Sequence, residues 1–210
     1  GVTEWSNWLW RHGANIWQNL ESRIIPSNHY LADVLGLAVV GSSFPQDATA
    51  QNWLRFARNE FPRALLAQTR RDGGLNEASL RYHAFVTEMA LLCRLALGKP
   101  FPKAAEERLQ AMCQILADFR DADGDVFAFG DDDSGRVLAL DFNSPLGRGD
   151  ILLKLAAAQL NREFTPAPSA VCPESGWWVR RNKDFVVALE YGGAGLRGLG
   201  GHAHNDDLSI

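Results

Sequence analysis

Two histidines stand two positions apart near the end of the sequence, at His202 and His204. The segment that carries them reads Gly201-His202-Ala203-His204-Asn205-Asp206-Asp207. Side chains at positions i and i+2 of a strand point to the same face, so this pair suits one metal ion, or one metal ligand beside a catalytic base. A polar turn with incidental histidines is the alternative, but the glycine-led cluster favours a functional site.

A tyrosine lies among ionisable residues in the segment that runs from Asp72-Gly73-Gly74 to His83. Tyr82 lies three residues before Phe85, beside an apolar helical stripe, and a buried core tyrosine is the ordinary expectation there. Its ionisable neighbours Glu77, Arg81 and His83 raise a functional alternative. Nearby cations lower the pKa of a phenol from its usual value of about 10, and such a phenol can both take and return a proton.

Asn28 and His29 stand where a helix is expected to begin, after Pro26-Ser27. Asparagine is a common N-cap residue, which would give Asn28 a purely structural role. The amide could also hydrogen-bond an anionic carboxylate, helped by the positive end of the helix.

Charge and composition limit the classes of partner. The chain of 210 residues has a net charge of −4, which does not favour general binding to nucleic acid. A polyanionic ligand would need a local basic patch, such as Arg70-Arg71 with Arg81, or Arg180-Arg181 with Lys183, although each also fits a solvated face. The three scattered cysteines suggest neither a disulfide framework nor a Cys-x-x-Cys metal site, and no apolar run is long enough to cross a bilayer.

The hydrophobic pattern changes from helical to strand-like along the chain. Helical spacing of apolar residues predicts helices over residues 5–20, 29–40, 48–68, 79–97, 103–119 and 150–161, with Ser79 as an N-cap. Two short apolar runs, Trp177–Val179 and Phe185–Leu189, predict strands joined by a polar turn. We therefore expect a mainly α fold followed by β: a helical part over 1–161, a linker over 162–175, and the opening of a β domain over 176–210. Sequential helical hairpins suit a bundle, a solenoid or a toroid.

These segments together resemble the heparinase II/III-like polysaccharide lyases over essentially the whole chain. The matching pieces are Asn28-His29, Asp72-Gly73-Gly74 through Glu77-Ala78-Ser79 to Tyr82-His83, Gly130-Asp131-x-Asp133, and Gly201-His202-x-His204-x-Asp206-x-Leu208-Ser209. The resemblance implies an incomplete (α/α) toroid of helical hairpins, followed by the start of an antiparallel β-sandwich domain. The family is normally longer, so the resemblance also implies a fragment.

The resemblance assigns roles residue by residue. Asn28 matches the residue that neutralises the uronate carboxylate, with His29 in reserve, and Tyr82 and His202 match the catalytic tyrosine and histidine. His204 matches a ligand to a structural zinc found in some members, whose other ligands would follow residue 210. Candidate substrate-binding residues are His29, Glu77, Arg81 and His83.

The chemistry that the resemblance implies is β-elimination on an acidic polysaccharide. Neutralising the uronate carboxylate makes the C5 proton easier to remove, a base takes it, and an acid protonates the leaving oxygen, which gives a 4,5-unsaturated product. The implied location is periplasmic or secreted, without membrane insertion and without nucleic acid as a partner.

Two other functions fit parts of the sequence. A glycoside hydrolase on a helical toroid would need two carboxylates facing a sugar, for which Glu77, Asp131 and Asp133 are available. A non-catalytic carbohydrate-binding scaffold could use some of the seven tryptophans to stack on sugars.

Overall fold

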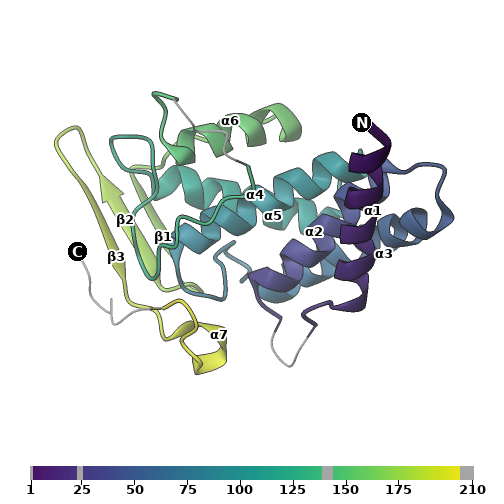
Figure 1. Ribbon diagram of the computed structural model, residues 1–210. Helices are drawn as coiled ribbons and strands as arrows, with labels where there is room; N and C mark the ends of the chain where they lie inside the picture. Colours follow the sequence, from purple (N-terminus) through teal and green to yellow (C-terminus); the bar gives the residue numbers. More distant parts are fainter. Residues whose placement is uncertain (1, 23–25, 139–143, 204–210) are drawn as a thin grey trace.

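The computed structural model describes residues 2–22, 26–138 and 144–203 (Figure 1). A helical part comes first and an antiparallel sheet follows it, so the predicted order of α before β is confirmed. The elements in chain order are α1 (Val2–Gln18), α2 (Asn28–Ser43), α3 (Ala48–Gln68), α4 (Leu80–Leu97), α5 (Lys103–Asp118), α6 (Arg148–Leu160), β1 (Ser169–Cys172), β2 (Trp177–Arg181), β3 (Val186–Glu190) and the short turn α7 (Gly195–Gly198).

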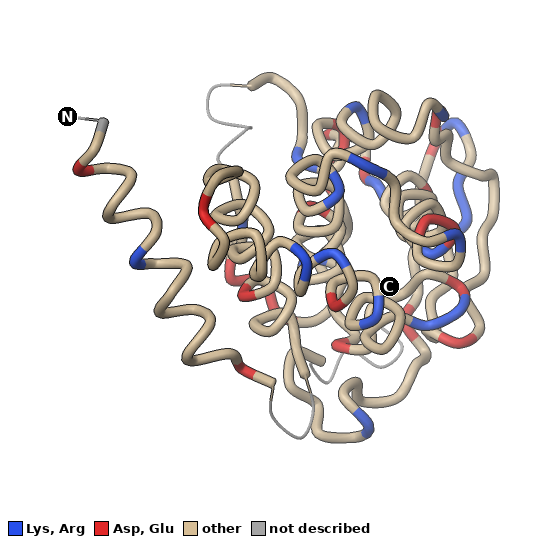
Figure 2. Tube along the Cα trace, turned by 90° about the vertical axis from the view of Figure 1, so that its right-hand side faces the viewer, with Lys and Arg blue, Asp and Glu red and all other residues tan. Residues whose placement is uncertain are grey.

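Helix α2 is the centre of the helical part. Its sequence is almost entirely apolar, and it packs against α1, α3 and α4, so that Leu31, Val34 and Leu37 have no exposed surface. Full burial of such a side chain contributes about 1.5–3 kcal/mol each. Helix α1 covers α2 from outside and lies at the edge of the molecule (Figure 2). Basic and acidic residues are both spread over the helical part in that view.

The sheet has the order β1-β2-β3 and is antiparallel throughout. Trp177 and Val179 of β2 lie on the same face and are fully buried against the ends of α4 and α5, where they contact Leu80, Ile115 and Phe119. The sheet is therefore packed onto the helical part through its own small core. Strand β1 lies inside the segment 162–175 that we expected to be a linker, and that boundary is corrected: its residues Ser169–Cys172, which follow the prolines, form a strand because they pair with β2.

The turn between α3 and α4 joins the helical part to the sheet. The Asp72 carboxylate accepts hydrogen bonds from the backbone N–H groups of Glu174 and Ser175, each at 2.8 Å, and from the Ser175 hydroxyl at 2.6 Å. Gly74 allows the close approach, because a Cβ at this position would lie 1.8 Å from the Ser175 hydroxyl oxygen. This turn fixes the direction in which the chain enters α4.

Candidate active site

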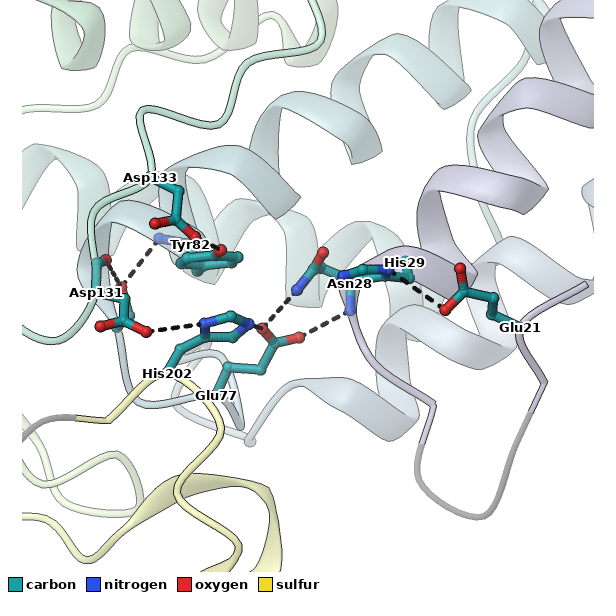
Figure 3. A network of polar contacts seen from close by, with 9 residues as sticks. Glu21, Asn28, His29, Glu77, Tyr82, Asp131, Asp133 and His202 are labelled. Atoms are coloured by element: carbon teal, nitrogen blue, oxygen red, sulfur yellow. Dashed lines mark hydrogen bonds and ion pairs between the residues drawn. The ribbon is translucent and has the colours of Figure 1, made fainter.

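Four segments distant in the sequence meet at one place (Figure 3). Asn28 begins α2, Glu77 and Tyr82 flank the start of α4, the loop after α5 brings Asp131, and the chain after α7 brings His202. Asn28, Tyr82 and His202, which the sequence suggested as catalytic residues, therefore belong to one connected group.

Asn28 and Glu77 form a buried pair. The Asn28 backbone N–H donates to Glu77 Oε1 at 2.8 Å, and its side-chain amide donates to Glu77 Oε2 at 2.7 Å. Ser27 rather than Asn28 occupies the N-cap position of α2, so the N-cap role considered for Asn28 is wrong. One N–H of the Asn28 amide is held by Glu77, while the amide oxygen of Asn28 points away from Glu77 (Figure 3). An asparagine side chain has a second N–H to offer a ligand.

The ring of His202 stacks on the ring of Tyr82. The ring centroids are 3.7 Å apart and the planes are inclined by 18°. Each nitrogen of His202 also lies near a carboxylate: Nδ1 is 3.3 Å from Asp131 Oδ2, and Nε2 is 3.4 Å from Glu77 Oε2. Each ring nitrogen of His202 therefore faces a carboxylate oxygen.

Tyr82 keeps its proton in this environment. Its hydroxyl donates to the Asp133 carboxylate. Burial raises the pKa of Tyr82 well above its ordinary value, and the hydrogen bond to Asp133 and the negative charges of Asp133, Glu77 and Asp131 raise it further. The expectation that nearby cations lower this pKa is wrong, because the charges around the phenol are acidic.

The two basic neighbours of Tyr82 point elsewhere. Arg81 pairs with Asp125 at 2.6 Å and with Asp132 at 3.5 Å. His83 is fully buried, with Nε2 3.0 Å from the Met112 carbonyl oxygen, and burial lowers its pKa to about 4. Consecutive helical residues point about 100° apart, so His83 faces the core while Tyr82 faces the site. A substrate beside Tyr82 does not reach His83, and its expected substrate-binding role is withdrawn.

The remaining candidates lie at the edge of the site or outside the described residues. His29 is exposed and lies 3.3 Å from Glu21, on the side of Asn28 away from Glu77 (Figure 3). His204 falls outside the described residues. Among the residues that the structure describes, there is no cluster of three or more His, Cys, Asp or Glu side chains arranged for a metal ion. The zinc prediction therefore stays a prediction.

The sequence did not indicate that Asp131 and Asp133 contact the catalytic candidates. Their segment was noted only as a piece of the family motif and as a possible source of carboxylates for a hydrolase. The Asp131 backbone N–H donates to the His202 carbonyl at 2.9 Å, and the Ser79 hydroxyl donates to the Asp131 carbonyl at 2.9 Å. A Cβ at Gly130, whose φ is +71°, would lie 2.5 Å from the His202 carbonyl oxygen. In the sequence, Gly130 and the fixed spacing of this motif from Tyr82 were the signals that could have indicated these contacts.

Comparison with known proteins gives a family match and several similar structures. The model of the heparinase II/III N-terminus matches residues 5–140, more than half of the chain. No protein of curated function matches the chain significantly. Among solved structures, a heparinase III with methylated lysines is 19% identical, with a TM-score of 0.66 over 94% of this chain and 32% of its own. The heparan sulfate lyase HepC from Pedobacter heparinus is 19% identical, with a TM-score of 0.64 over 99% of this chain and 34% of its own.

The structural likeness establishes the fold. The chain spans about a third of the length of these structures. The predicted fold class is confirmed: part of an (α/α) toroid, followed by the start of an antiparallel β domain.

Proposed function

The chain belongs to the heparinase II/III family, and from this premise we propose that it carries the catalytic group of an enzyme that cleaves uronate-containing polysaccharides by β-elimination. The observation that carries the proposal is the meeting of an amide, a phenol and an imidazole, from Asn28, Tyr82 and His202, around one buried carboxylate. Elimination next to a carboxylate needs these three chemical capacities: a donor for the developing charge, an acid and a base.

Asn28 supplies the donor. The free N–H of its amide, at the positive end of α2, hydrogen-bonds the uronate carboxylate and stabilises the enediolate charge that develops when C5 loses its proton. Because Glu77 already fixes the amide, little reorganisation is needed when the charge appears.

The electrostatics favour His202 as the base and Tyr82 as the acid. His202 takes the C5 proton, the electrons of the C5–H bond form the C4–C5 double bond, and the C4–O bond breaks. Tyr82 gives its hydroxyl proton to the leaving oxygen. Asp131 and Glu77 lie against the two nitrogens of His202 and hold its ring in place, while burial and the acidic surroundings that raise the pKa of Tyr82 keep its proton in place until the leaving oxygen needs it.

The two alternative functions have less support. A hydrolase needs two carboxylates that face a sugar. Here Glu77 is 1% exposed and accepts hydrogen bonds from Asn28. Asp131 contacts His202, and Asp133 accepts a hydrogen bond from Tyr82, so each of the three carboxylates already binds a protein side chain. For a sugar-stacking scaffold, the exposed tryptophans Trp5, Trp8 and Trp17 lie on α1, away from the catalytic group.

Two further predictions accompany the proposal. Zinc binding by His204 is independent of the elimination, and no step depends on it. A periplasmic or secreted location follows from the family, and none of the described helices is long and apolar enough to span a bilayer.

The proposal is tested by mixing the purified protein with a panel of uronate polymers and recording the absorbance of the new double bond. We expect Tyr82→Phe to lower kcat by about a hundredfold or more, because the leaving oxygen loses its acid. Tyr191→Phe is the matched control, since Tyr191 is exposed at the end of the sheet. Folded protein that releases reducing ends without this absorbance would refute the elimination.

A further inference from the structure

The hydroxyl of Tyr82 is already engaged in the structure. It donates its hydrogen bond to the Asp133 carboxylate (Figure 3). A phenol has a single O–H, and a strong hydrogen bond uses it for one acceptor. While this bond is intact, Tyr82 has no proton to offer to the oxygen of a bound sugar. Cleavage by the proposed mechanism therefore requires that Asp133 first releases the hydroxyl.

Asp133 lies on a short exposed turn between two anchored points. At one end, the backbone N–H of Asp131 donates to a carbonyl of the chain after α7 at 2.9 Å. At the other end, the backbone N–H of Leu138 donates at 2.9 Å to Glu88, a buried residue of α4. Residues 132–134 between these anchors are exposed. Because they bury little surface, Asp133 can move away from the phenol while both anchors stay in place.

The backbone of this turn is held in an unfavourable conformation. Ser134 has a φ of +52°, in the left-handed region that few residues other than glycine adopt. Its N–H donates to the Asp132 carboxylate at 2.9 Å, which closes the turn. Residues with such backbone angles gather at active sites and in segments that switch between two states. A change in this turn would release the strain at Ser134.

The charge of Asp133 opposes both the acid and the substrate. Burial is the first cause that raises the pKa of Tyr82, and the hydrogen bond to Asp133 and its negative charge are the next. A phenol with a raised pKa gives up its proton less readily. An acidic polymer also brings its own carboxylate toward Asn28, and like charges repel. The bound polymer therefore favours the state in which Asp133 has moved away.

We propose that Asp133 is a latch on Tyr82: in the free protein it holds the hydroxyl, and a bound acidic polymer displaces it. The inference rests on the proposed function, because the latch matters only where Tyr82 is the acid. Displacement breaks one hydrogen bond and no covalent bond, after which the O–H of Tyr82 turns to the leaving oxygen. The latched state weakens the observed affinity for the polymer, since only the released fraction of the protein is competent.

The test compares Asp133→Asn with Asp132→Asn. Both variants remove one negative charge from adjacent exposed positions, but Asp132 contacts Arg81 and the backbone of Ser134 rather than Tyr82. The rate is the absorbance of the new double bond, on a uronate polymer that the unaltered protein cleaves. We expect Asp133→Asn to raise kcat/KM about tenfold, because no hydrogen bond to a charged acceptor has to be broken. Asp132→Asn should change it by about twofold or less, the usual effect of a surface charge.

A binding measurement separates the latch from the chemical step. On the His202→Gln background the polymer is not cleaved, and its affinity is titrated by calorimetry. Adding Asp133→Asn to this background should strengthen binding about tenfold, whereas adding Asp132→Asn should strengthen it by about twofold or less. Because a gain is expected in both experiments, a folding defect cannot produce the predicted result.

The outcomes separate the latch from the proposed function. Cleavage by the unaltered protein, with Asp133→Asn equal to or below it in kcat/KM, would overturn the latch alone. Equal gains for Asp133→Asn and Asp132→Asn would also overturn it, because the effect would then be one of charge and not of the contact with Tyr82. Absence of cleavage of any polymer by the unaltered protein would refute the proposed function, and the latch with it.

Discussion

At the scale of single residues, Glu77 organises the candidate site. Its two oxygens accept the backbone N–H and one side-chain N–H of Asn28, and one of these oxygens also faces His202. The carboxylate is almost inaccessible, which makes Glu77 a positioning residue rather than the substrate-binding residue that the sequence suggested. One buried carboxylate thus orients the Asn28 amide and lies next to the ring of His202.

Replacing Glu77 by glutamine should lower kcat by about ten- to a hundredfold. The neutral amide accepts through one oxygen only, so it cannot hold the backbone N–H and the side-chain N–H of Asn28 together, and a hydrogen bond to a charged group contributes about 1.5–3 kcal/mol. Because the amide of Asn28 then moves, we also expect its side-chain NMR resonances to shift in the absence of substrate. Steady-state kinetics and an amide spectrum measure the two effects.

Glu106→Gln is the matched control for Glu77→Gln. Glu106 likewise accepts a backbone and a side-chain hydrogen bond, from Phe101 and Arg94, but lies outside the site. The control should lower the melting temperature without lowering activity. Equal activity of Glu77→Gln and wild type would contradict the positioning role.

Sequence alone could identify Asn28, Tyr82 and His202 as candidates, because the residue types and motif order carry that information. It could not give the direction of the pKa shift of Tyr82. That direction comes first from the burial of the phenol and then from Asp133, which accepts its hydrogen bond from a loop about 50 residues later, while the adjacent Arg81 and His83 point away.

At the scale of elements, the α3–α4 turn decides where Tyr82 lies. Asp72 binds the β1–β2 turn, and Gly74 packs directly against Ser175. The sheet therefore meets the turn before α4 through a contact that leaves no room for a side chain at position 74.

Gly74→Ala should destabilise the protein by about 1–3 kcal/mol, the usual cost of forcing an extra methyl group into a packed contact. The Cβ would overlap the Ser175 hydroxyl, so the turn must shift and α4 must move with it. Denaturant unfolding measures the loss. Gly193→Ala is the control, since a Cβ there meets nothing within 4 Å. Equal stability of the two variants would refute the tight contact.

The helices could be predicted well from sequence, since each carries its own apolar period and Ser79 caps α4 as expected. Strand β1 could not. Its residues have no strong strand preference, and only pairing with β2 and the burial of Cys172 make them a strand.

At the scale of the whole molecule, His83 links the helical part to the sheet. Its imidazole bonds the Met112 carbonyl of α5, and its ring meets Trp177 of β2 edge to face, with centroids 5.9 Å apart. Burial lowers the pKa of His83 from 6.5 to about 4, so the folded protein keeps this ring neutral.

Stability should therefore fall in mild acid. Above pH 6.5, His83 is neutral in both the folded and the unfolded protein. Between pH 6.5 and about pH 4, His83 binds a proton in the unfolded protein but not in the folded protein. Between pH 7 and pH 5 the free energy of unfolding should drop by about 2 kcal/mol from this residue. Denaturant unfolding of wild type and His83→Gln measures it: the variant should lose this slope, and equal slopes would contradict the neutral buried ring.

The most direct test of β-elimination is the fate of water during cleavage. The protein and a uronate polymer that it cleaves are incubated in water labelled with heavy oxygen, and the fragments are analysed by mass spectrometry. The mechanism predicts fragments with an unsaturated end sugar, because His202 and Tyr82 transfer protons and no water is added across the cleaved bond; the fragments are reduced at once, so that the anomeric oxygen at the new reducing end cannot exchange with the labelled water. Saturated fragments that carry the label at the new reducing end would mean hydrolysis and would contradict the account.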